Sequence, residues 1–182
     1  MSLYVRLIHK ENWLNTESKT ELNGEAITID WKCKDNEWSV FKCEDSVADL
    51  EKTDLLNKIV LRMVADNPDS LSSGANLLVL DNRFIQAIGS DIVDDPEKLG
   101  CQHCNFKDIN YGKIDKAVEY TLQNKLTNLI SYSPKEIRGL LLALSPDNKK
   151  DFIDYAKCKS GNDRLKRIGK YFLQKEKNFF SI

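Results

Sequence analysis

The chain of 182 residues contains no apolar stretch of the roughly 20 residues that a helix needs to cross a bilayer. Residues 1–6 also lack the basic region followed by an apolar run that marks a protein for export. Neither a Gly-x-Gly-x-x-Gly fingerprint nor a phosphate-loop motif occurs, which argues against a nucleotide-dependent enzyme. Together these absences predict a cytoplasmic protein that does not act at a membrane.

Residues that bind metals or form disulfides are few. The chain has two histidines and five cysteines, an odd number without regular spacing. Such a set fits free thiols in a reducing compartment better than a disulfide scaffold.

The charges, by contrast, are abundant and unevenly divided. Residues 1–100 carry 11 Lys and Arg against 19 Asp and Glu, a balance of −8, whereas residues 101–182 carry 16 against 9, a balance of +7. This division predicts an acidic α+β region, 1–100, joined to a basic helical region, 101–182, within one compact unit. A basic face is a candidate surface for a polyanion or an acidic partner.

The N-terminal region has the period of strands, then that of a helix. Alternating or β-branched residues predict strands at 3–8, 26–31 and 37–43, the last two as a hairpin in an antiparallel sheet. Helical spacing follows over 46–65, and the apolar run 77–80 suits a buried strand. A short helix is expected to start near Phe84, and glycines and aspartates predict mostly loop over 89–112.

The C-terminal region has the period of helices. One apolar stripe predicts a helix over 113–131, and Ser133-Pro134 and Ser145-Pro146 each carry a helix start signal. A last helix is expected over 163–175. The fold class predicted is α+β: a small, mostly antiparallel N-terminal sheet with one covering helix, followed by a C-terminal bundle of three to four helices.

Cys101, His103 and Cys104 form a candidate metal site. Two thiolates at this spacing can chelate Zn²⁺, but a closed structural site needs four ligands. Completion would require His103 and one further cysteine brought in by the fold, from Cys33, Cys43 or Cys158. The alternative is a plain loop that carries two thiols.

Asp30 and Lys32 form a candidate catalytic pair. Metal-dependent nucleases place Asp-x-Lys on a strand, where the carboxylate holds Mg²⁺ and the lysine steadies the attacking water. Such a site needs further carboxylates near the metal, and the candidates are Glu11, Glu21, Glu25 and Asp81. The alternative is the end of a strand with solvated charges, because three-residue matches are frequent in a chain this charged.

The third candidate is a basic ridge on the last predicted helix. Helical projection places Lys159, Lys166, Arg167 and Lys170 near one another and away from the apolar stripe. Such a ridge suits phosphates or a protein partner, and a solvated helix face is the alternative.

These features favour a small non-enzymatic interaction or accessory protein that docks a protein partner, or another copy of itself, through its acidic and basic regions. Two alternatives stay open: a metal-dependent nuclease or hydrolase that uses Asp30 and Lys32, and nucleic-acid binding by the C-terminal helices. No cofactor is expected, and zinc or magnesium enters only with the site hypotheses above.

Overall fold

A computed structural model of the protein describes residues 3–8, 13, 21–31, 36–43, 52–66, 68–95, 103–124, 127–160 and 168, with 157–160 described by their backbone alone. The described strands are β1 (Leu3–Ile8), β2 (Trp38–Cys43), β3 (Ala75–Leu80), β4 (Ile92–Asp94), β5 (His103–Phe106) and β6 (Leu129–Tyr132). The described helices are α2 (Gly24–Trp31), α3 (Asp54–Asp66), α4 (Ser70–Ser73), α5 (Asn82–Ile88), α6 (Tyr111–Asn124), α7 (Pro134–Leu142) and α8 (Pro146–Ser160). The predicted α+β class is confirmed.

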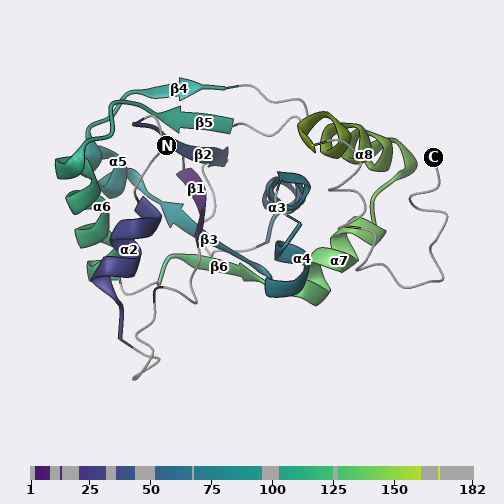
Figure 1. Cartoon of the computed structure of the whole chain (residues 1–182), viewed down its shortest axis with the longest axis horizontal. Helices are drawn as coiled ribbons and strands as arrows, with labels where there is room; N and C mark the ends of the chain where they lie inside the picture. The colour runs from purple at the N-terminus through teal and green to yellow at the C-terminus, as the bar shows by residue number, and fades with distance from the viewer. Residues whose placement is uncertain are drawn as a thin grey trace. The chain divides into compact units, whose positions relative to one another are not determined.

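The strands form one six-stranded sheet in the order β4-β5-β2-β1-β3-β6 (Figure 1). β1 pairs antiparallel with both β2 and β3, and β5 pairs antiparallel with both β2 and β4. The strand predicted at 3–8 joins an antiparallel sheet, as expected, and lies between β2 and β3. Among the described residues, no helix combines the length and the apolar character that crossing a membrane requires.

Contacts within the chain divide it into two compact units. The first unit, called the acidic unit below, comprises residues 1–51, 76–97 and 102–130. The second, called the basic unit, comprises residues 52–75, 98–101 and 131–182. Counted over these ranges, the acidic unit has 11 Lys and Arg against 19 Asp and Glu, a balance of −8, and the basic unit has 16 against 9, a balance of +7. These units are not the regions 1–100 and 101–182, because 52–75 belongs to the basic unit and 102–130 to the acidic unit, yet each unit has the same charge balance as the corresponding region.

The core of the acidic unit lies between one face of the sheet and helices α2, α5 and α6, which lie together in Figure 1. Because side chains alternate along a strand, this face receives even-numbered residues of β1, β2, β3, β4 and β5. The buried strand residues of this core are Tyr4, Ile8, Trp38, Val40, Leu78, Leu80, Cys104 and Phe106. The run Leu77 to Leu80 is buried on both faces, which explains why it is apolar without alternation.

Phe84 of α5 lies at the centre of an aromatic cluster in this core. Its ring centroid is 5.1 Å from that of Tyr120, 5.4 Å from Trp31, 6.1 Å from Phe106 and 6.2 Å from Trp38. These separations are in the range in which tilted and edge-to-face aromatic pairs attract. One side chain therefore joins all three helices to β2 and β5.

Residues 26–31 were predicted as a strand of a hairpin, and this prediction is wrong, because they belong to helix α2. The Asn23 side chain accepts hydrogen bonds from the backbone N–H groups of Glu25 (3.0 Å) and Ala26 (3.2 Å), as a helix N-cap does. Ile27 and Trp31, four residues apart, are both fully buried on one face of the helix. The cap and this buried pair outweigh the strand preference of the β-branched residues.

Two further predictions of secondary structure are wrong in part. The stretch 89–112 was predicted to be mostly loop but contains the short strands β4 and β5. The helix predicted over 113–131 ends at Asn124, whose carbonyl accepts hydrogen bonds from both the backbone N–H and the hydroxyl of Thr127. After this turn the chain enters strand β6, and the Asn128 carbonyl accepts from the Val79 N–H at 2.9 Å.

Other predicted elements are confirmed. Strands appear at 3–8, 38–43 and 75–80, and a short helix begins near Phe84. The helix predicted over 46–65 is confirmed only in its second part, because Lys52 and Thr53 are described and not helical and α3 begins at Asp54. Helix α7 has the expected capping box, in which the Ser133 hydroxyl accepts from the Glu136 N–H and the Glu136 carboxylate accepts from the Ser133 N–H. The helix predicted over 163–175 lies outside the described residues except for Ile168.

In the basic unit, α3 packs against α7 and α8, and α4 packs against α7. The guanidinium of Arg62 on α3 is almost fully buried and lies 3.0 Å from the centre of the Tyr155 ring on α8. The Tyr155 hydroxyl donates a 2.7 Å hydrogen bond to the Asp66 carboxylate, and Asp66 also pairs with Arg62. A buried cation is costly unless it has such partners, so this cluster fixes α8 against α3.

We expect Phe84→Leu to lower the free energy of unfolding of the acidic unit by about 2 kcal/mol, since each aromatic pair contributes roughly 0.5–1.5 kcal/mol beyond area burial. All three tryptophans lie in this unit, so tryptophan fluorescence during denaturant unfolding reports on it specifically. The matched control is Phe41→Leu, because Phe41 is also buried but lies outside the aromatic cluster, against the His103 ring. Equal losses in the two variants would contradict a central role for Phe84.

We expect Tyr155→Phe to lower the free energy of unfolding of the basic unit by about 1.5 kcal/mol. The variant loses one hydrogen bond, and a bond to a charged acceptor contributes more than the usual value of about 1 kcal/mol. The measurement is thermal unfolding followed by circular dichroism. Tyr111→Phe is the control, because the Tyr111 side chain is exposed. A Tyr155→Phe variant as stable as this control would show that the hydroxyl contributes nothing.

Candidate functional site

The Asp30 and Lys32 hypothesis loses the strand on which it depends, because Asp30 lies on helix α2. The Asp30 carboxylate accepts a 2.7 Å hydrogen bond from the Trp13 indole N–H, and the Asp30 carbonyl accepts from the Arg6 guanidinium at 3.1 Å. Lys32 and Glu11 lie outside the described residues. Over the part of the chain that the structure describes, no three His, Cys, Asp or Glu side chains come together as metal ligands would.

The Cys101, His103 and Cys104 hypothesis placed these residues in a loop, but His103 and Cys104 lie on strand β5, while Cys101 is outside the described residues. As neighbours on a strand, His103 and Cys104 point to opposite faces of the sheet. The His103 Nδ1 lies 3.0 Å from the Asp95 carboxylate, and the Cys104 thiol donates to Asp94 at 3.4 Å.

The structure describes the side chains of two cysteines, Cys43 and Cys104, and both are buried. Burial, followed by the neighbouring Asp94 carboxylate, raises the pKa of Cys104 to about 11. Burial raises the pKa of Cys43 to about 12. Both side chains are therefore neutral thiols at neutral pH.

The basic ridge lies almost entirely outside the described residues. Lys159 belongs to the last turn of α8, where the backbone alone is described, and Lys166, Arg167 and Lys170 are not described. The ridge stays a prediction.

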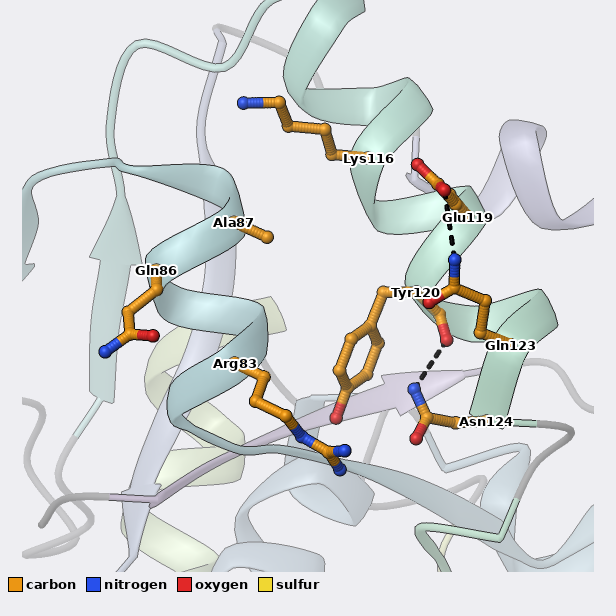
Figure 2. Close-up of a pocket in the computed structure, with 8 residues that line it drawn as sticks. All are labelled: Arg83, Gln86, Ala87, Lys116, Glu119, Tyr120, Gln123 and Asn124. Atoms are coloured by element: carbon orange, nitrogen blue, oxygen red, sulfur yellow. Dashed lines mark hydrogen bonds between the residues drawn. The ribbon is translucent and has the colours of Figure 1, made fainter.

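A hollow that the sequence did not indicate lies between α5 and α6 in the acidic unit, with a volume of about 590 Å³. It is called the α5–α6 hollow below. Figure 2 shows the Tyr120 ring between the two helices, with charged and amide side chains around it. The lining residues are Arg83, Gln86 and Ala87 from α5 and Lys116, Glu119, Tyr120, Gln123 and Asn124 from α6.

Helix α5 has well-defined ends that fix its lining residues. The Asp81 carboxylate caps its N-terminus by accepting from the backbone N–H groups of Arg83 (3.0 Å) and Phe84 (3.1 Å). Gly89 ends the helix in the left-handed conformation, with φ of 55°. Phe84 and Ile88 are buried, while Arg83, Gln86 and Ala87 are exposed.

Helix α6 is amphipathic in the same way. Ile114, Ala117, Tyr120 and Thr121 are buried, while Lys116, Glu119 and Gln123 are exposed. Tyr120 links the core to the hollow, because its ring packs on Phe84 and its hydroxyl accepts a 3.1 Å hydrogen bond from the Asn128 amide.

Asp81 also orients the side chain of Arg83. The Asp81 Oδ2 atom lies 3.0 Å from the Arg83 Nε and 2.9 Å from its Nη2. Burial by itself would raise the pKa of Asp81, but the Phe84 N–H and the Arg83 guanidinium outweigh it and lower this pKa below its ordinary value. Burial, and then the Asp81 charge, raise the pKa of Tyr120. At neutral pH the lining residue Arg83 is therefore paired with an ionised Asp81, and the lining residue Tyr120 is a neutral phenol.

The comparisons with known proteins give no match: no family model fits the chain, and no curated protein or solved structure is detectably similar to it.

We expect Asp81→Ala to lower the free energy of unfolding of the acidic unit by about 1 kcal/mol, as loss of an N-cap does. Asp81→Asn is the matched control, because asparagine also caps helices. Unfolding followed by tryptophan fluorescence is the measurement, and equal losses in both variants would show that charge rather than capping is the main contribution.

The contribution of the Asp81 charge to stability should depend on pH, and comparison of the natural protein with Asp81→Asn tests this. Because the folded-state pKa of Asp81 is lowered, its ionisation stabilises the fold above its ordinary pKa of 3.8, and this stabilisation is lost as the pH falls through the lower, folded-state value. The stability difference between the natural protein and Asp81→Asn should therefore shrink in acid. A difference that does not change between neutral pH and strong acid would contradict the ionised pair.

Proposed function

We propose that this protein is a non-enzymatic interaction or accessory protein, whose acidic and basic units dock on partner surfaces of opposite charge. The observation that carries this proposal is that the charge division follows the structural units, with −8 on one and +7 on the other. Opposite charge steers association and selects partners more than it adds affinity.

The described surface residues support this proposal. Exposed lysines of the basic unit include Lys58, Lys135 and Lys150, and exposed carboxylates of the acidic unit include Asp91, Asp108 and Asp115. A single chain with both kinds of surface is complementary to another copy of itself. Association between copies, with an acidic unit against a basic unit, is the first form of docking to test.

Sedimentation velocity at low and at high salt tests this form of docking. We expect larger species at low salt that dissociate as salt screens the charges. Lys135→Glu combined with Lys150→Glu should reduce the association, because both changes remove positive charge from the basic unit. The control changes Lys10 and Lys125 to Glu, which lowers the net charge equally but within the acidic unit, and this control should not weaken the association.

Fluorescence anisotropy of labelled duplex DNA and single-stranded RNA, at the same two salt concentrations, tests the alternative partner. If binding depends steeply on salt and is lost when Lys166, Arg167 and Lys170 are changed to Glu, the partner is nucleic acid and not a protein. A protein that stays monomeric and binds neither probe at low salt would contradict docking through charge.

A further inference from the structure

The α5–α6 hollow presents hydrogen-bond donors from the exposed Arg83 side chain on α5. A guanidinium has five N–H donors, and the contacts with Asp81 use Nε and Nη2. The Nη1 edge is left for another acceptor, and the ion pair with Asp81 orients the exposed guanidinium. A guanidinium edge of this kind matches the two oxygens of a carboxylate.

The same hollow presents hydrogen-bond acceptors from α6. The Asn124 amide nitrogen donates to the Tyr120 carbonyl at 2.7 Å, and the Gln123 amide nitrogen donates to the Glu119 carboxylate at 3.0 Å. Carbonyls and carboxylates only accept, so both amides have a single possible orientation. The side-chain oxygens of Asn124 and Gln123, together with the Glu119 carboxylate, are therefore the acceptors of this wall.

The charges around the hollow nearly cancel. Arg83 is offset by Asp81, and Lys116 has Glu119 as a counterpart on the same helix. The acidic unit as a whole carries −8, which disfavours a simple anion. A ligand that carries both signs of charge satisfies the donors and the acceptors together.

We propose that the α5–α6 hollow binds a small zwitterion of amino-acid or dipeptide size, with its carboxylate on Arg83 and its ammonium group on the acceptor oxygens of α6. A volume of about 590 Å³ lies in the range of small-molecule sites. The small side chain of Ala87 leaves room between the helices, where Figure 2 shows it facing α6. This site goes beyond the proposed docking function and does not rest on it.

The test is titration of the full-length, ¹⁵N-labelled protein followed by amide chemical shifts. The probes are L-alanine, L-glutamine and L-alanyl-L-alanine, and two half-ligands, propionate and ethylamine, each carry one of the two charges. We expect saturable shifts in α5 and α6 for a zwitterion, with a dissociation constant below about 10 mM, and at least tenfold weaker binding of both half-ligands. Tighter binding of the dipeptide than of the amino acids would identify short peptides as the ligand class. Tighter binding of the amino acids would identify free amino acids.

Two variants test the assigned contacts. Arg83→Gln should weaken zwitterion binding about tenfold or more, and Glu119→Gln should weaken it while leaving propionate binding unchanged. The matched control, Arg138→Gln, removes an arginine from α7 of the basic unit and should bind like the natural protein. The proposal is overturned if no zwitterion shifts α5 and α6 resonances at about 10 mM, if a half-ligand binds as tightly, or if folded Arg83→Gln binds unchanged.

Discussion

The packing of Phe84 against four aromatic rings is the contact on which the acidic unit depends most. Trp31 comes from α2, Trp38 from β2, Phe106 from β5 and Tyr120 from α6, so elements far apart in sequence meet at one ring. The indole N–H groups are satisfied within the same unit, since Trp38 donates to the Trp31 carbonyl and Trp31 to the Thr121 hydroxyl. The cluster therefore fixes the spacing of the helices without leaving a buried donor unpaired.

The α5–α6 hollow follows from this constraint. Phe84 faces the core, so Arg83 and Ala87 on the same short helix face away from it, and Tyr120 contributes its ring to the core and its hydroxyl to the polar side. Asp81 then both caps α5 and orients the Arg83 guanidinium. The apolar packing of Phe84 and Tyr120 thus positions the polar side chains of the hollow, as rigid elements do in other binding sites.

Much of the fold could be predicted wherever local signals and burial agree. Ser133-Pro134-Lys135-Glu136 is a complete capping box, and α7 begins there. Residues 26–31 were misassigned because a side-chain cap at Asn23 and the burial of Trp31 in a distant core decide their structure, and neither is visible in a local pattern. The hollow could not be predicted for the same reason, since Arg83 and Asn124 are separated by forty-one positions and meet only through tertiary packing. The sequence shows an uneven distribution of charge but not the bounds of the two units, because 52–75 and 102–130 are assigned by contacts that no local pattern shows.

Native-state hydrogen exchange of the full-length protein is the most direct test of the claim that the Phe84 cluster makes α5 and α6 one cooperative body with the sheet. The account predicts that the hydrogen-bonded amides of α5, α6, β2 and β5 exchange with the same free energy of opening, since none of these elements can leave without breaking the cluster. If α5 instead opens at a much lower free energy than β2 and β5, the cluster does not hold it, and the hollow has no rigid base.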